Sequence, residues 1–215
     1  MSVYKLYCRG ESGNCYKVAL MLNLVGADWE SEFVDFFKPV EAAMGFKPTA
    51  MMIMARHPEI THHLGKLAIT IMCEDGTIGM SLKWMIAHLA SLSAGCSYCS
   101  AHTLSNGHDF GVPLDKIEEI WSYEHSDRFT DAERAALSFA QVASLTPSGA
   151  TDAHFDELHK YWSDDQIVEM VAVVSFFGFM NRFNDNLDVT LEDKPLDFAK
   201  AQGLEKQGWE ARGGR

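Results

Sequence analysis

The chain has 215 residues, 47% of them apolar, which suits one domain or one domain with an appendage. Its formal net charge is −12, and no basic stripe is present to contact phosphates, which argues against nucleic acid and against a membrane surface as partners. The sequence begins without a signal-peptide core, and no apolar run approaches the roughly 18 residues of a membrane span, so we expect a cytoplasmic protein.

The first 38 residues differ in pattern from the rest. Alternation over residues 4–7 predicts a short strand, and helical apolar spacing over 15–25 predicts a helix that stops at Gly26. A second strand is predicted over 29–37, ended by Pro39. These elements form a β–α–β unit, and we place a domain boundary after residue 38.

The remainder of the chain is predicted to be helical, with a helical domain over 39–200 and a polar tail of little regular structure over 201–215. Capping boxes begin two of the helices, one at Thr130 with Glu133 and one at Ser163 with Gln166. The second of these helices is apolar nearly all round, which indicates burial in the domain or in an oligomer interface. The predicted helices cover residues 49–55, 58–73, 81–93, 96–106, 113–122, 135–144 and 164–186.

The five cysteines include one close pair, Cys96 and Cys99, directly after Gly95. Two intervening residues at a helix start bring the sulfurs close enough for a disulfide, and amide groups at that helix end favour a thiolate at Cys96. His102 lies on the same helix face and titrates between pH 5 and 8. A thiolate, a second thiol that resolves a sulfenic acid, and a base are the parts of a two-cysteine peroxide reductase.

Other interpretations of these residues stay open. His88, eight residues before Cys96, either joins the proton relay or is a core or interface histidine. The cysteine pair is redox-active, a structural zinc site, or a pair of inert buried thiols; an odd cysteine count without an export signal is a poor disulfide framework. The absence of a second Cys-x-x-Cys weakens zinc, and we expect no metal and no cofactor. Candidate further zinc ligands are His102, His108, His57, His62 and His63.

Further motifs accompany the cysteine pair: Gly-Phe-Lys-Pro at 45–48, Ala-Arg-His-Pro-Glu at 55–59, Leu-Lys at 82–83, Phe-Thr-Asp-Ala-Glu-Arg-Ala-Ala-Leu at 129–137, Phe-Phe-Gly-Phe-Met-Asn-Arg at 176–182 and Gly-Trp-Glu at 208–210. With these motifs the chain resembles the carboxymuconolactone decarboxylase-like superfamily from about residue 45 to 188. Within it, the resemblance is to the alkyl hydroperoxidase D-like (AhpD-like), peroxidase-related branch.

The resemblance implies a mainly α fold, an AhpD-like helical bundle that assembles as a dimer, trimer or hexamer. It implies that Cys99 forms the sulfenic acid, that Cys96 is the proton donor and resolving thiol, and that His102 is the relay histidine. The sequence departs from the family twice. Trp84 stands where the family usually has a glutamate, and the histidine falls three rather than four residues after the second cysteine. We hypothesise that His88 replaces the missing carboxylate.

The N-terminal segment resembles a different family. Lys-Leu-Tyr at 5–7, followed by Ser-Gly-Asn-Cys-Tyr-Lys-Val at 12–18, is similar to the opening β–α–β unit of a glutathione transferase. Ser12 matches a position that activates the glutathione thiol in that family. The alternative is a structural appendage that packs on the helical domain or pairs strands with a second subunit, because two strands with exposed edges are marginal alone.

The sequence therefore predicts a thiol-dependent peroxidase that reduces a hydroperoxide or other small molecule, is restored by a dithiol or thioredoxin-like reductant, and forms a homo-oligomer. Two alternatives are a lactone decarboxylase-like enzyme and a non-catalytic helical oligomer whose cysteine pair senses redox state or binds zinc. Asn181, Arg182 and Asp185 form a buried polar network at a subunit interface or line the pocket.

Overall fold

A computed structural model describes residues 4–6, 21, 24–25, 29–31, 40–42, 44–72 and 76–212. The chain forms two compact units, residues 1–66 and 67–215, and we take each by itself. The compact units divide after Lys66, inside helix α4 (Pro58–Ile71). The domain boundary after residue 38 stays a prediction.

The first unit contains two short strands and the beginning of the helical region. Strand β1 (Tyr4–Leu6) pairs in parallel with β2 (Trp29–Ser31), with Tyr4 opposite Trp29. The helix expected between the strands, the remainder of the second predicted strand and Ser12 lie wholly or mostly outside the described residues. Helix α3 (Thr49–Met54) follows Pro48 and buries Ala50 and Met54. Proline suits the first position of α4 because the first amide groups of a helix have no intrahelical acceptor.

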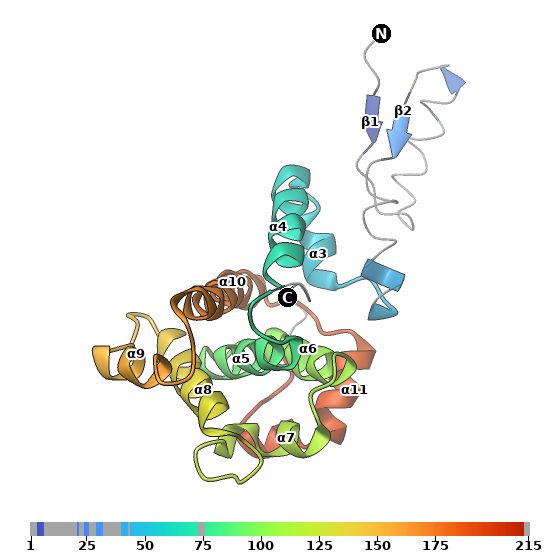
Figure 1. Ribbon diagram of the computed structural model, residues 1–215. Coiled ribbons are helices and arrows are strands. Elements are labelled where there is room, and N and C mark those ends of the chain that lie inside the picture. Colours follow the sequence, from blue (N-terminus) through green and yellow to red (C-terminus); the bar gives the residue numbers. More distant parts are fainter. Residues whose placement is uncertain are drawn as a thin grey trace. The chain divides into compact units, whose positions relative to one another are not determined.

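The second unit is a bundle of helices, so the predicted mainly α fold is confirmed. Helix α5 (Met80–Ser93) is its core and packs against α6 (Ser97–Asp109), α8 (Asp131–Ala143) and α10 (Asp164–Asn186) (Figure 1). Ten consecutive residues of α5, from Leu82 to Ser91, are buried. The remaining elements are α7 (Leu114–Glu119), η1 (Ile120–Ser122), α9 (Asp152–Leu158), α11 (Asp193–Ala201) and η2 (Leu204–Gln207).

Local sequence explains several helix ends. Thr130 and Ser163 form the predicted capping boxes of α8 and α10. The prediction that the cysteine helix stops at Gly107 is wrong, because α6 continues to Asp109. A side chain at Gly107 would lie 3.4 Å from Val112 and 3.5 Å from Trp84. This glycine therefore permits close packing of neighbouring elements rather than ending the helix.

The sequence misses α9 and α11, and the tail is more ordered than expected. Residues 204–207 form η2, and Trp209 is only 6% exposed. Both missed helices are short, of seven and nine residues. Helices of this length are stabilised mainly by packing against the bundle, and a local apolar pattern indicates such packing only weakly.

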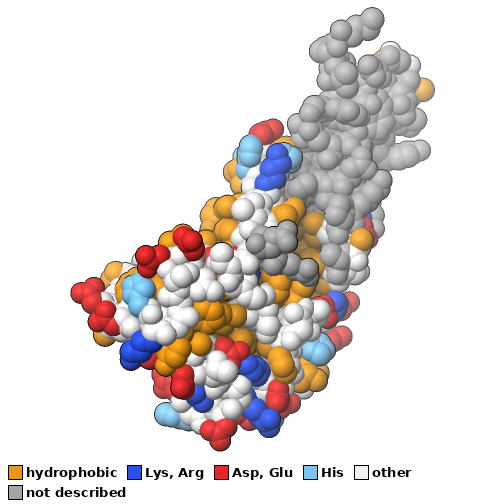
Figure 2. Space-filling model, viewed as in Figure 1, with side chains coloured by type: hydrophobic (Ala, Val, Ile, Leu, Met, Phe, Trp, Pro, Cys, Tyr) orange, Lys and Arg blue, Asp and Glu red, His pale blue; other side chains and the backbone are white. Residues whose placement is uncertain are grey.

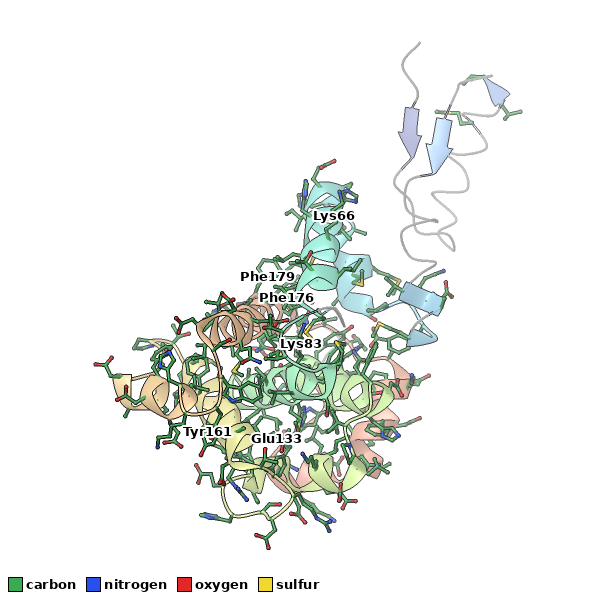
Figure 3. All side chains as sticks on the ribbon, in the orientation of Figure 1. Lys66, Lys83, Glu133, Tyr161, Phe176 and Phe179 are labelled. Carbon is green, nitrogen blue, oxygen red and sulfur yellow. The ribbon has the colours of Figure 1, made fainter. Side chains whose placement is uncertain are left out.

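A buried ion pair joins α5 to α10. Lys83, labelled in Figure 3, is 0% exposed; its Nζ lies 2.5 Å from Glu169 Oε1 and donates to the carbonyl of Ile71 at 2.9 Å. Glu169 also accepts the backbone N–H groups of Thr77 and Ile78, at 2.6 and 3.1 Å. Partial burial alone would raise the pKa of Glu169, but hydrogen bonds from Lys83 and Thr77 lower it. The pair fixes the segment before α5, which gives the Leu-Lys motif a structural reason.

Among the described helices, α10 is long and apolar enough to cross a membrane by length and composition alone. The sequence predicts no such span. Within the bundle this helix carries Glu169, which pairs with Lys83, and the buried amides of Asn181 and Asn184. On the face shown in Figure 2, acidic and basic side chains are interspersed over the described surface.

Candidate active site

The cysteine pair lies at the turn between α5 and α6. Gly95 has a φ of 72°, a left-handed conformation that suits glycine, and it reverses the chain after α5. Cys96 is then the N-cap residue of α6, and its Sγ accepts the backbone N–H of Cys99 at 3.4 Å. Both cysteines are free thiols, with 1% and 3% of their surface exposed. The structure therefore places the two predicted cysteines together, at the helix start that the sequence indicates.

The two thiols differ in acidity. Hydrogen bonds from the side chain and backbone of Cys99 lower the pKa of Cys96, against the opposing effect of burial. Burial, chiefly, raises the pKa of Cys99 well above its ordinary value, and its interaction with Cys96 adds to this. The lowered pKa of Cys96 agrees with its place at the helix start, where the sequence predicts a thiolate.

Asn184 on α10 contacts the second cysteine directly. Its Nδ2 donates to Cys99 Sγ at 3.1 Å, and the residue is 1% exposed. This hydrogen bond stabilises a thiolate at Cys99, so it opposes the effect of burial on the pKa. The neighbouring carboxylate of Asp185 acts in the other direction and raises the pKa of both cysteines. The sequence does not single out Asn184, because 85 residues separate it from its partner.

His102 is held by a carboxylate from elsewhere in the chain. Its Nε2 lies 2.6 Å from Glu192 Oε2, and the other oxygen of Glu192 accepts from the Tyr98 hydroxyl at 2.9 Å. The Tyr98 and His102 rings stack with their centroids 4.2 Å apart. The carboxylate that the sequence lacks at position 84 is thus present beside the histidine, supplied by the residue just before α11.

Trp84 itself belongs to an aromatic cluster. Its ring stacks on Phe110 with centroids 5.5 Å apart and meets Phe177 edge-on at 6.2 Å. The tryptophan is 8% exposed, so it fills core space where the family usually has an acid.

His88 is buried on α5, only 2% exposed. Its Nδ1 lies 3.0 Å from the hydroxyl of Thr103, which in turn donates to the carbonyl of Cys99 at 2.7 Å. Burial lowers the pKa of His88 to about 4, so the imidazole is neutral at pH 7. His88 thus reaches the cysteine pair through the backbone of Cys99, a geometry that supports a positioning role rather than replacement of a carboxylate.

A C-terminal segment covers the residues between the cysteines. The Trp209 indole N–H donates to the carbonyl of Ser97 at 2.9 Å, and the Ser97 hydroxyl donates to the carbonyl of Glu210 at 2.5 Å. The backbone N–H of Arg212 donates back to the same hydroxyl at 3.2 Å. We call residues 209–212 the C-terminal strap. Its three hydrogen bonds to one residue of the Cys-x-x-Cys turn hold it over α6.

The described residues include no group of three or more histidine, cysteine, aspartate or glutamate side chains that could hold a metal ion. His102 is engaged with Glu192, and His108 stacks on Phe198 with centroids 5.2 Å apart. The zinc interpretation of the cysteine pair therefore gains no support from the described part of the chain.

No protein-family model matches this chain. Among curated proteins, the chain is 28% identical over 94 residues to YnjA of Escherichia coli strain K12, a match that covers 44% of this chain and about half, 52%, of that protein. The chain is also 20% identical over 112 residues to YdfG of Bacillus subtilis strain 168, a match that covers 52% of this chain and 76% of that protein.

Solved structures define the fold class and then the family. A peroxidase-related protein from Ralstonia eutropha JMP134 with an AhpD core has a TM-score of 0.69 at 20% identity, covering 77% of this chain and 86% of its own. This likeness establishes an AhpD-like fold. The debrominase Bmp8, as a cysteine-to-alanine variant in complex with 2,3,4-tribromopyrrole, has a TM-score of 0.73 at 30% identity and covers 86% of this chain and 93% of its own. The chain belongs to the family of this debrominase and has the AhpD-like fold. The glutathione transferase likeness of the N-terminal segment finds no support in these comparisons.

Proposed function

We propose that the protein is a dithiol-dependent reductase of small hydroperoxides. The observation that carries this proposal is the placement of Cys96 at the N-cap of α6, where its sulfur accepts hydrogen bonds from Cys99. A thiolate is the nucleophilic form of cysteine, and the lowered pKa of Cys96 increases its population near neutral pH. The second thiol, Cys99, is three residues away in sequence and can resolve a sulfenic acid on Cys96.

The reaction has two steps. The Cys96 thiolate attacks the terminal oxygen of the hydroperoxide, the O–O bond breaks, and the leaving alkoxide takes a proton to become an alcohol. Cys96 is now a sulfenic acid. Cys99 attacks the Cys96 sulfur, the S–S bond forms, and water leaves with the proton from Cys99. A dithiol or thioredoxin-like partner then returns two electrons and two protons to the disulfide.

His102 is the proposed proton carrier for these steps. It lies one turn after Cys99 on α6, and its hydrogen bond to Glu192 fixes the orientation of the ring. Tyr98 holds the other oxygen of Glu192, so the carboxylate cannot rotate without losing a second hydrogen bond. His88 is assigned a positioning role through Thr103 and Cys99.

Access to the sulfurs requires movement, because both are almost fully buried. The C-terminal strap is the element whose displacement would uncover them, since it is bonded to Ser97 between the two cysteines. We propose that a protein reductant reaches the disulfide in this open form, in the cytoplasm, and that the protein acts as a homo-oligomer.

Reductive dehalogenation is a second candidate, favoured by the 30% identity to the debrominase Bmp8 over 93% of that chain. The dithiol chemistry is the same in electron count. A C–H bond replaces the carbon–halogen bond, halide leaves, and the two thiols become a disulfide. The same pair of cysteines therefore serves either an O–O or a carbon–halogen substrate.

Thiol titration with mass spectrometry tests the proposal. Equimolar hydrogen peroxide or cumene hydroperoxide should remove two thiols and leave a Cys96–Cys99 disulfide. In a parallel reaction, the protein is given 2,3,4-tribromopyrrole under the same conditions, and the bromide released measures dehalogenation. Persistence of all thiols with every substrate would overturn both candidates. Peroxide turnover without bromide release selects the first candidate, and the reverse selects the second.

Single-cysteine variants test the order of attack. In Cys99→Ser, peroxide should leave a sulfenic acid on Cys96 that dimedone labels, with no disulfide. In Cys96→Ser, labelling of Cys99 should be slow because burial raises its pKa. Rapid labelling of Cys99 and none of Cys96 would restore the order that the family resemblance implies.

A further inference from the structure

A cleft of about 290 Å³ lies at the end of α5, the helix that precedes the cysteine pair. Residues 93–94 at the end of α5, residues 144–146 after α8, and the last third of α10 from Gly178 to Asn186 line it. Its volume is at the lower end of the roughly 300–1,000 Å³ typical of small-molecule sites. The cleft therefore suits a small substrate rather than a fatty acyl chain.

Residues that neighbour the cleft lining in sequence connect it to the cysteine pair. Ala94 in its wall is two residues before Cys96. Asn184, which donates to Cys99 Sγ, is on α10 between cleft residues Arg182 and Asp185. The charge of Asp185 acts on both thiols. A molecule in this cleft is thus within the electrostatic surroundings of the cysteine pair.

Arg182 presents a positive charge in the cleft. Its Nη1 donates to the carbonyl of Gly178 at 2.8 Å and its Nη2 to the hydroxyl of Thr146 at 2.6 Å. Within the described part of the chain, no carboxylate lies at ion-pair distance from this guanidinium. These two neutral acceptors orient the planar donor group, and a guanidinium binds carboxylate with two parallel hydrogen bonds.

Asn181 adds an unsatisfied amide to the same wall. It is 4% exposed, and neither its Nδ2 nor its Oδ1 has a hydrogen-bond partner among the described residues. A buried amide left without partners costs free energy, so such a group in a native site calls for a ligand or an ordered water. Asp185, about one turn further along α10 in the same lining, disfavours a second negative charge.

We propose that this cleft is the substrate pocket of the cysteine pair and that it selects small electrophiles carrying one acidic group, which Arg182 binds with Asn181 beside it. This inference rests on one part of the proposed function, namely that the cysteine pair is the reactive centre. The acid group lies at Arg182, and the reducible bond of the substrate faces the sulfurs. The proposal takes Asn181, Arg182 and Asp185 as pocket lining rather than as a polar network at a subunit interface.

Iodoacetate and iodoacetamide test this proposal without peroxide. Both alkylate a thiolate by the same displacement, in which an S–C bond forms and iodide leaves, and they differ in one carboxylate. The rate of Cys96 alkylation by each reagent is measured by peptide mass spectrometry in the reduced protein. We expect Arg182→Gln to lower the iodoacetate-to-iodoacetamide rate ratio about tenfold or more, as loss of a charge-assisted hydrogen bond implies.

Controls separate binding from structure. Arg182→Lys should give an intermediate ratio, and Arg128→Gln, which alters an exposed arginine paired with Asp115, should leave the ratio unchanged. A purely structural role for Arg182 would change both rates equally, and an unchanged ratio would overturn the proposal. Because no peroxide is involved, failure here leaves the proposed reductase activity standing.

The proposal can also be tested on the unaltered protein, so that the result does not depend on whether a variant folds. Millimolar benzoate should slow iodoacetamide alkylation of Cys96, and benzamide at the same concentration should not. Equal protection by both compounds, or by neither, would contradict an acid-selective cleft even if Arg182→Gln failed to fold.

Discussion

Asn184→Ala removes the one side-chain donor to Cys99 Sγ that the described structure provides. A hydrogen bond to a charged group contributes about 1.5–3 kcal/mol, so its loss should raise the pKa of Cys99 further. Cys99 acts in the second step of the proposed reaction, and disulfide formation should slow about 10- to 100-fold. Formation of the Cys96 sulfenic acid should change little, because Asn184 bonds only the second sulfur.

Rapid-mixing tryptophan fluorescence with hydrogen peroxide separates these two steps, since Trp209 packs on the cysteine turn through Ser97. In the variant, dimedone should label Cys96 more completely than in the parent protein, because the sulfenic acid lives longer. Asn106→Ala, near the C-terminal end of α6, is the matched control and should leave both phases unchanged. A slower first phase with a normal second phase would refute the assignment of Cys99 as the resolving thiol.

Four further predictions follow from the same contacts. Glu192→Gln should slow turnover, because a neutral amide orients the His102 ring less strongly than the carboxylate that now contacts it at 2.6 Å; an unchanged turnover rate would contradict this. Trp209→Ala should speed iodoacetamide alkylation of the cysteine pair about tenfold by releasing the C-terminal strap, and an equal rate would argue against that route. Lys83→Met should cost roughly 3 kcal/mol of unfolding free energy in urea, since it leaves Glu169 unpaired, and adding Glu169→Gln should recover part of the loss. His88, with a pKa lowered from 6.5 to about 4 by burial, contributes stability that is complete above pH 6.5 and falls by roughly 3 kcal/mol as the pH drops to 4; His88→Leu should flatten that part of the stability curve.

Much of the site was predictable because it is local. Cys96, Cys99 and His102 lie within one helix start, and glycine before a cysteine predicts both the turn and the helix end that makes the first thiol more acidic. Thr130 and Ser163 mark their helices through contacts three residues away. Such features depend on spacing that can be read directly from the sequence.

The partners of these residues were not predictable, because they come from distant parts of the chain. Asn184 is 85 residues from Cys99, and Glu192 is 90 residues from His102. An asparagine at the end of an apolar helix and a glutamate before a short helix have no distinguishing local pattern. Packing brings the asparagine to Cys99 and the glutamate to His102. The near-complete burial of Cys99, which raises its pKa, is likewise a property of the whole bundle and not of local spacing.

The acidity of the two thiols tests the central claim most directly. The rate of iodoacetamide alkylation is followed against pH in Cys99→Ser and in Cys96→Ser, with the labelled peptide identified by mass spectrometry. We predict that Cys96 titrates below an ordinary cysteine and that Cys99 titrates above it. A Cys99 that ionises at lower pH than Cys96 would contradict the account.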